Sequence, residues 1–295
     1  MAGGRLVTGQ PHLPTTPHRL MQAAMTITAP SVRISGTRVY AVVERAIVLS
    51  FFHSRAASLF GIILLSAVAE PVLYLLALGL GVGSLVDRKI IVDGHALSYV
   101  QFVSPGMLAV SCMTGAISAS VFSFYARHRH LGIFRMICST SVNSYELVLA
   151  DLIWNIFRVT MLSGIFVIVM AVTGLVDVGN AFAAFLATIL VNAAFCAVGM
   201  GVSTLLRGWQ DFDIITVVQT MLFLFSGTFF PIDQYPSWIQ AIVQISPLYH
   251  SIELIRALTI GNYGLALIGH ISYLLLMVVG GLIFSGWRLD KDLSR

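Results

Sequence analysis

Long apolar runs, each followed by a short polar or charged segment, dominate the chain. A helix needs about 20 residues to cross the hydrocarbon core of a membrane, at about 1.5 Å per residue. Six runs reach or approach that length, and the pattern predicts six membrane-spanning helices. Their expected ranges are 59–83, 102–124, 147–172, 181–205, 214–230 and 265–286. The chain is therefore predicted to be an all-α integral membrane protein.

The residues before the first run follow a different pattern. Residues 32–58 alternate charged and apolar side chains at helical spacing, which is typical of a helix lying in the membrane interface. A helix packed against its own protein fits the same pattern, and both interpretations stay open. Residues 1–30 are rich in Pro, Thr and Gly and are predicted to be a disordered cytoplasmic segment. The membrane domain is expected over 31–290, with a tail at 291–295. The charged residues of the interface helix are Arg38, Glu44 and Arg45.

Two short helices are expected between the fifth and sixth spans, in residues 231–263. Trp238, Ile242 and Ile245 recur at helical spacing after Ser237, and a second helix is expected over 250–258. In that second helix Glu253 lies three residues before Arg256, a spacing that brings the two charges together. Short helices satisfy their own backbone hydrogen bonds inside a bilayer. The segment is therefore predicted to be a re-entrant helical hairpin on the outer side.

Charge agrees with a membrane protein and sets its direction. Hydrophobic residues make up 57% of the chain and charged residues only 10%, against about 25% charged residues in typical soluble domains. Thirteen Lys and Arg residues fall in the segments on the side of the N-terminus and three on the other side. Because cytoplasmic loops carry the excess of positive charge, both termini are predicted to face the cytoplasm. The basic residues are scattered between apolar runs, so no nucleic-acid partner is indicated.

A few charged residues fall inside the predicted spans, where an unpaired charge is costly. Glu70 precedes Pro71 in the first span, while Asp151, Asn155 and Arg158 share one face of the third span. A contact between Glu70 and Arg158 is one hypothesis. In the alternative, Arg158 reaches toward the inner interface and Glu70 is hydrogen-bonded locally.

The sequence carries no established signature of catalysis or metal binding. The chain has no GxxxxGK[ST] phosphate loop, no HExxH and no GxSxG, and these are motifs with a known chemical mechanism. The run from Arg127 to His130 is interpreted as a solvated basic loop, because arginines beside the histidines repel a cation. Cys112, Cys138 and Cys196 show no paired spacing. No metal site and no catalytic residue are predicted.

The run GTFFPIDQYPSWIQAIVQISPLYHSIELIRALTIG, residues 227–261, resembles the outer signature of ATP-binding-cassette type-2 exporter permeases. The stretches EPVLYLLALGLGVG and YVQFVSPGMLAVSCMTGA agree with it. Within that family the chain is most similar to the NodJ and daunorubicin-resistance-type transport permeases. The residues on the signature positions are Gly227, Phe230, Pro231, Pro236, Pro247, His250 and Arg256.

The resemblance implies a transport subunit and not an enzyme. It implies a permease homodimer, or a heterodimer with a related permease, in contact with membrane lipids and with two copies of a separate phosphate-loop ATPase. That partner is expected to bind ATP and Mg²⁺, with no cofactor on this chain. The implied location is the inner, cytoplasmic membrane. The interface helix and the loop between the second and third spans are expected to contact the ATPase, and the candidate docking residues in that loop are Arg129, Phe134, Arg135 and Met136.

The implied substrate is a lipid-linked or amphiphilic molecule moved outward: a lipo-oligosaccharide, a glycolipid or a hydrophobic drug. Two other classes of function remain as alternatives. An ion-coupled secondary transporter would use protonation of Glu70 and would work without an ATPase. An integral-membrane enzyme acting on lipids would use Glu70, Asp151 or His250, but these residues lack a reactive spacing.

Overall fold

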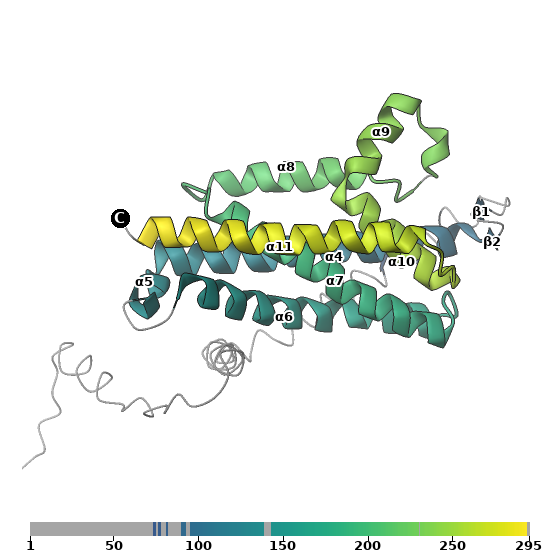
Figure 1. The fold of residues 1–295 in the computed structure, drawn as a ribbon. Helices are drawn as coiled ribbons and strands as arrows, with labels where there is room; N and C mark the ends of the chain where they lie inside the picture. Colours follow the sequence, from purple (N-terminus) through teal and green to yellow (C-terminus); the bar gives the residue numbers. More distant parts are fainter. Residues whose placement is uncertain are drawn as a thin grey trace, which may run out of the picture. The chain divides into compact units, whose positions relative to one another are not determined.

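The computed structural model describes residues 73, 74, 76, 77, 81, 90–92, 95–138, 143–229 and 231–293, and nearly all of this part is helical (Figure 1). Segment 1–30, the interface helix expected over 32–58 with Arg38, Glu44 and Arg45, and the residues Glu70 and Phe230 lie outside the described residues. Of the first expected span, only residues 73, 74, 76, 77 and 81 are described, and all five have helical backbone.

Four helices of the described chain are long and apolar enough to cross a membrane. They span Tyr99–Arg129, Ser144–Val172, Val178–Ser203 and Ala266–Asp292. The first comprises α4 (Tyr99–Tyr125) and a continuing π-helical turn, η3 (Ala126–His130); the others are α6 (Ser144–Val172), α7 (Val178–Ser203) and α11 (Ala266–Leu293). The expected second, third, fourth and sixth spans are therefore present as helices.

Polar caps explain where three of these helices begin. Ser98 and Gln101 form a capping box at the start of α4, in which each side chain accepts a hydrogen bond from the other residue's backbone N–H. Asn143 accepts from the backbone of Tyr145 before α6, and Asp177 accepts from Gly179 before α7. Such caps satisfy backbone donors that the first helical turn leaves unpaired.

The expected fifth span is shorter in the structure than its apolar run. Helix α8 covers Asp211–Leu224, 14 residues, which is less than the roughly 20 needed to cross the hydrocarbon core. The helix ends before Ser226 and Gly227, and Gly227 has a φ of +73°. A left-handed backbone cannot continue a right-handed helix. The range 214–230 expected for this helix was therefore wrong at both ends.

The two short helices expected after the fifth span are both present. A 3₁₀ turn, η4 (Ile232–Gln234), precedes α9 (Ser237–Ile245) and α10 (Pro247–Ile260). The three prolines of the signature mark the starts of these elements: Pro231 before η4, Pro236 before α9 and Pro247 in the first turn of α10. Proline fits there because the first helical turn needs no N–H donor from it.

A two-stranded antiparallel hairpin was not expected. Strand β1 (Ile90–Val92) pairs with β2 (His95–Leu97), with Ile90 opposite Leu97. The signal in the sequence is the dipeptide Asp-Gly between the triplets Ile-Ile-Val and His-Ala-Leu, which favours a tight hairpin loop. The described chain is thus mostly helical and not strictly all-α.

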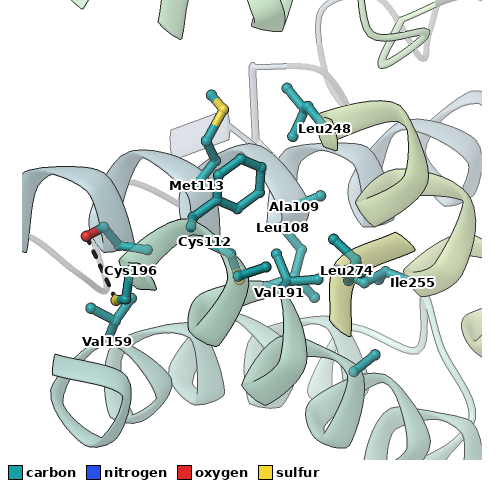
Figure 2. Close-up of a cluster of buried hydrophobic side chains, with 14 of the residues drawn as sticks. Leu108, Ala109, Cys112, Met113, Val159, Val191, Cys196, Leu248, Ile255 and Leu274 are labelled. Atoms are coloured by element: carbon teal, nitrogen blue, oxygen red, sulfur yellow. Dashed lines mark hydrogen bonds between the residues drawn. The ribbon is translucent and has the colours of Figure 1, made fainter. Parts of the chain in front are cut away.

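The core is formed where α4, α6, α7, α10 and α11 meet. Figure 2 shows its centre, and the side chains labelled there are fully or almost fully buried. Cys112 of α4 and Cys196 of α7 are both fully buried, and Cys196 donates its thiol hydrogen to the carbonyl of Ala116, 3.7 Å away. The other labelled residues are Leu108, Ala109, Met113, Val159, Val191, Leu248, Ile255 and Leu274.

Side-chain contacts define two ends of this bundle. At the α5 end, η3, the short helix α5 (Ile133–Cys138), the start of α6 and the end of α11 lie together. At the α10 end, Asn180 of α7 donates to the carbonyl of Thr259 and accepts from the hydroxyl of Tyr263. Figure 1 shows α5 and α10 at opposite ends of α11.

Candidate functional site

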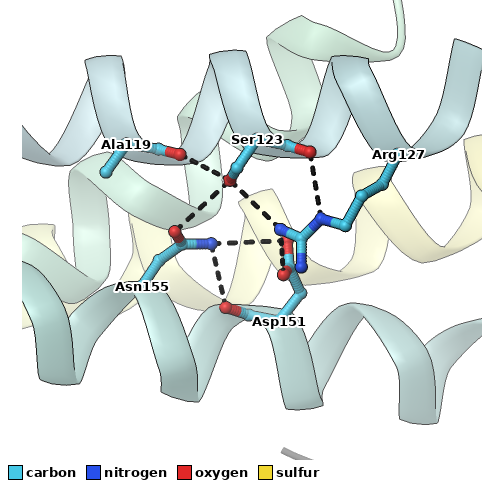
Figure 3. A network of polar contacts seen from close by, with 5 residues as sticks. All are labelled: Ala119, Ser123, Arg127, Asp151 and Asn155. Carbon is cyan, nitrogen blue, oxygen red and sulfur yellow. Dashed lines mark hydrogen bonds and ion pairs between the residues drawn. The ribbon is translucent and has the colours of Figure 1, made fainter. Parts of the chain in front are cut away.

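A charged pair lies inside the bundle at the α5 end, between η3 and α6. Arg127 is 4% exposed and Asp151 is 1% exposed. A guanidinium nitrogen of Arg127 forms an ion pair with a carboxylate oxygen of Asp151 (Figure 3). Arg127 also donates from Nε to the carbonyl of Ser123 at 3.0 Å and from Nη2 to the Ser123 hydroxyl at 3.1 Å. The charge therefore has both an ionic partner and neutral acceptors.

Asn155, one helical turn after Asp151, completes the Arg127–Asp151 cluster. Its amide Nδ2 donates to the Asp151 carbonyl at 2.9 Å and to the Asp151 carboxylate at 3.3 Å, while its Oδ1 accepts from the Ser123 hydroxyl at 3.4 Å. The cluster thus joins α4 to α6 through a continuous set of polar contacts (Figure 3). Buried charges are tolerated when they are paired and hydrogen-bonded in this way.

The interpretation of residues 127–130 as a solvated loop was wrong. The helix α4 continues without a break into η3, and this continuation carries Arg127 inward, against Asp151. Asp151 and Asn155 do share a face, as expected, but the arginine that joins them is Arg127 and not Arg158. The signal that could have found it is Ser123, placed one turn before Arg127 at the end of a long apolar run.

Three further contacts tie the α5 end together; we call them the α11 brace. Asp292, near the end of α11, accepts from His128 at 3.4 Å and from Arg129 at 3.3 Å. Asp290 accepts from the hydroxyl of Ser144, the first residue of α6, at 3.2 Å. The connection between α4 and α6 is therefore held to both α6 and α11.

The expected docking residues of this connection are not equivalent. Phe134 is 0% exposed: its ring packs against Phe124 at 4.9 Å, and the guanidinium of Arg127 lies 5.6 Å from its centre. In this structure the Phe134 side chain faces inward and offers no surface to a partner. Arg129 and Arg135 are exposed, and Met136 lies within α5.

A second buried arginine lies at the α10 end. Arg256 is 4% exposed, pairs with Glu253 one turn earlier, and donates to the carbonyl of Gly227 at 3.3 Å. Its guanidinium lies 4.1 Å from the centre of the Phe102 ring, within the range of a cation–π contact. The expected Glu253–Arg256 pair is confirmed. The first and last signature positions, Gly227 and Arg256, are thereby in direct contact.

His250 takes part in an aromatic stack at the same end. Its Nδ1 lies 2.8 Å from Nδ1 of His270 on α11, and its ring stacks on Tyr273 with centroids 4.0 Å apart. The Tyr273 hydroxyl donates to the carbonyl of Ile245 at 2.7 Å. Burial, and secondarily the neighbouring His270, lowers the pKa of His250 below its ordinary value. His270 was not identified from the sequence, because no local spacing links two residues twenty positions apart.

A groove with a volume of about 470 Å³ lies between α4 and α8. Arg158 of α6 lines this α4–α8 groove, together with residues of the two flanking helices. Phe122 and Thr216 are exposed, so the groove opens onto the surface of the described part of the chain. The polar and aromatic side chains that line it are Ser118, Phe122, Arg158, Phe212, Thr216 and Gln219.

Neither arginine cluster has the composition of a metal or cofactor site. Within the described ranges, no three His, Cys, Asp or Glu side chains are grouped so that they could hold a metal ion. The two clusters instead join helices that are distant in sequence. Their chemistry is that of structural charge pairing.

Comparison with known proteins agrees with this arrangement. The model of the ABC-2 type transporter family matches residues 60–260. Nodulation protein J of Rhizobium meliloti (strain 1021) is 32% identical over 200 residues, 68% of this chain and 74% of that protein. Nodulation protein J of Rhizobium leguminosarum bv. trifolii is 30% identical over 233 residues, 79% of this chain and 87% of that protein.

A more distant relative has a transport description. The putative transport permease ycf38 of Porphyra purpurea is 22% identical over 197 residues, 65% of this chain and 66% of that protein. The family model covers more than half of the chain and includes both arginine clusters and the groove. With its long apolar helices, the chain is a multi-pass membrane protein, and it belongs to the ABC-2 type transporter family.

Proposed function

We propose that the chain is the permease subunit of an ATP-binding-cassette exporter in the cytoplasmic membrane. In this proposal six segments cross the membrane, the fifth through the short helix α8 and the residues that follow it, with both termini in the cytoplasm and the α5 end on the cytoplasmic side. The four long helices and the distribution of Lys and Arg support this topology. Helix α9 supports a re-entrant hairpin on the other side, because only Val243 of its residues is buried and Trp238, Ile242 and Ile245 are exposed.

ATP hydrolysis belongs, in this proposal, to a separate subunit. The sequence has no GxxxxGK[ST] motif to hold the phosphates of ATP. We place ATP and Mg²⁺ on two copies of a phosphate-loop ATPase, bound to a permease homodimer or to a heterodimer with a related permease. The exposed Arg129 and Arg135 near α5 are the candidate contacts on this chain.

The observation that carries the proposal is the double attachment of the η3–α5 connection. Arg127 ties it to α6, and the α11 brace ties it to α11. A movement of this connection, caused by closure of the ATPase subunits, would therefore move two spanning helices together. A flexible loop could not transmit such a movement.

The proposed substrate is a lipid-linked or amphiphilic molecule, such as a lipo-oligosaccharide, a glycolipid or a hydrophobic drug. The resemblance to NodJ-type permeases supports this class. The α4–α8 groove supports it as well, because aromatic and small apolar residues line most of it, as is usual for sites that bind apolar ligands.

Co-purification from native membranes tests the function. The tagged full-length chain is isolated in mild detergent and examined for a bound phosphate-loop ATPase. The expected result is an associated ATPase, and ATP-dependent movement of an acyl-labelled lipid across reconstituted vesicles. That movement is expected to stop when the ATPase carries a substituted phosphate-loop lysine. A chain that purifies alone and transports without ATP would contradict the proposal.

A further inference from the structure

Arg158 occupies an unusual position in the membrane helix α6. It is the central residue of Ser144–Val172, fourteen residues from either end, which is about 21 Å along the helix axis in each direction. That distance exceeds the length of an arginine side chain, so its guanidinium cannot reach either end of the helix. A charge at this depth requires a partner or a polar cavity. Arg158 instead lines the α4–α8 groove.

Within the described part of the chain, Arg158 has no counter-charge. The ion pairs formed there use Arg127, His128, Arg129 and Arg256. The carboxylate of Asp151, seven residues earlier on the same helix, is occupied by Arg127 and Asn155. Among the described residues, the positive charge of Arg158 therefore faces the groove without an ion-pair partner of its own.

A second donor of the groove also lacks an acceptor. The side-chain amide nitrogen of Gln219 on α8 is buried, with no hydrogen-bond partner in the described structure. Such a group is costly to bury unless something accepts its hydrogen bond. Arg158 and Gln219 thus place positive charge and hydrogen-bond donors on two walls of one groove.

Apart from the hydroxyl groups of Ser118 and Thr216, the remaining lining is apolar. Phe122 and Phe212 contribute aromatic faces, while Gly115 and Ala119 leave room beside them. Helix α8, which forms one wall, buries none of its own residues. The groove therefore combines a cationic, donor-rich point with a wall suited to hydrocarbon. A neutral ligand would leave the charge of Arg158 uncompensated, and a small inorganic anion would leave the apolar wall empty.

We propose that the cargo of this permease is an anionic amphiphile, whose negatively charged head group is bound by Arg158 and Gln219 while its apolar part lies along the α4–α8 groove. The proposal rests on the export function proposed above and narrows its substrate class. Charge-assisted hydrogen bonds from a guanidinium to a phosphate or carboxylate are among the stronger polar contacts in proteins.

A binding assay on the purified full-length chain tests this inference. The probes are phosphatidylglycerol and phosphatidylcholine with the same fluorescent acyl chain, which differ in net head-group charge. Wild type is expected to bind phosphatidylglycerol roughly tenfold more tightly. Arg158→Gln is expected to bring that ratio close to one, while Arg158→Lys retains most of it. Arg207→Gln, at an exposed arginine outside the groove, is the matched control and keeps the wild-type ratio.

Three results would overturn the proposal. The first is equal affinity of wild type for both lipids, or an unchanged ratio in Arg158→Gln. The second is displacement of phosphatidylglycerol by millimolar inorganic phosphate, which would mean that the site binds an anion alone. The third is dissociation of an oligomer in Arg158→Gln, measured by light scattering, because Arg158 would then face an acid of a second copy.

The assay separates this inference from the export function. Lipid binding is measured without nucleotide and without the ATPase. If the ATPase co-purifies but the charge preference is absent, the permease function stands and the anionic cargo is wrong. If the preference depends on Arg158 but no ATPase associates, the lipid site stands and the export function fails.

Discussion

Arg127 and Asp151 bring two opposite charges into an interior that is otherwise mostly apolar. Removing water from either charge costs several kcal/mol, and their mutual attraction and hydrogen bonds offset this cost only while both are present. Removing one residue of the pair is therefore expected to cost more stability than removing both. Loss of one partner leaves an uncompensated charge, whereas loss of both leaves only a change of shape.

We therefore predict that Asp151→Leu destabilises the protein by about 3–5 kcal/mol. The double variant Arg127→Met with Asp151→Leu is expected to recover most of this loss, because no charge then remains buried. Thermal unfolding in detergent measures both effects, with Arg207→Met as the exposed control. Equal losses in the single and double variants would show that the contribution is packing and not charge pairing.

The contact between His250 and His270 depends on how many protons their two rings carry. With their Nδ1 atoms 2.8 Å apart, one ring must donate and the other must accept, so at least one ring is neutral. Protonation of both rings places two donors and two positive charges against each other. The lowered pKa of His250, caused by burial and then by His270, reflects this preference for the neutral form.

Stability is accordingly predicted to fall in mild acid. Because the pKa of His250 is lower in the folded chain than its ordinary value of 6.5, the unfolded chain binds the proton more readily below that pH. The contribution is complete above about pH 6.5 and decreases as the pH drops toward the folded pKa. Unfolding temperatures from about pH 7.5 to about pH 5.5 measure it. His270→Gln should give a shallower dependence; an unchanged slope would exclude this pair as the cause.

At the scale of elements, glycines set the distance between α7 and α11. A Cβ at Gly281 would lie 2.6 Å from the backbone carbonyl carbon of Ala197, whereas a Cβ at Gly280 meets nothing within 4 Å. Two helices can approach this closely only where one of them lacks a side chain. The neighbouring glycines thus differ completely in what surrounds them.

Gly281→Val is predicted to destabilise the chain by about 1–3 kcal/mol through overpacking, whereas Gly280→Val is expected to leave the unfolding temperature nearly unchanged. Both substitutions have the same chemistry and helix propensity, so their difference isolates the α7–α11 contact. Thermal unfolding of the two variants side by side is the measurement. Similar unfolding temperatures for both would mean that α7 and α11 do not approach closely in the membrane.

Much of this architecture could be predicted from the apolar runs, from the helical spacing of residues and from the prolines between them. The four long helices follow from their apolar runs, and α9 and α10 from the prolines and the helical spacing after Pro236 and Pro247. The Glu253–Arg256 pair followed from its spacing within a single helix. Each of these features depends on residues that are close in sequence, which is where such patterns carry information.

The features that were missed depend on tertiary contacts. Asp151 lies 24 residues from Arg127, and Phe134 faces inward, where it packs against Phe124 and Arg127. Helix α8 is a different case: it ends at Leu224, where Phe225 leaves the helical backbone region with φ −104° and ψ 35°, inside the apolar run itself. For Asp151 and Phe134, helical spacing does not show which side chains meet when the helices pack. The α4–α8 groove is of the same kind, since three helices contribute to it.

At the scale of the molecule, the α11 brace connects the last spanning helix to the connection between α4 and α6. Its ion pairs are partly exposed: Asp292 keeps 15% of its side-chain surface and Arg129 keeps 44%. Partly exposed pairs contribute little to stability. We expect these pairs to matter for coupled movement instead, because they make η3 and α11 move together.

We predict that Asp290→Asn with Asp292→Asn changes the unfolding free energy by less than about 1 kcal/mol but lowers ATP-driven transport severalfold. The partner ATPase should still bind and hydrolyse ATP, since the exposed arginines remain. Transport and hydrolysis measured in the same vesicles give the ratio of the two. Asp213→Asn, at an exposed acid on α8, is the control. A parallel loss of transport and hydrolysis would indicate impaired assembly instead of lost coupling.

The positions of the cysteines have a practical consequence for measuring movement at the α5 end. The chain has three cysteines; Cys112 and Cys196 are sealed in the core, while Cys138 ends the short helix α5 and is partly exposed. A thiol-reactive fluorophore should therefore attach at Cys138 in the native sequence, without prior removal of the other two. Burial raises the pKa of the Cys138 thiol, so labelling is expected to need mildly alkaline buffer. Cys138 is thus a native attachment site for a fluorescent reporter at the end where ATPase binding is proposed.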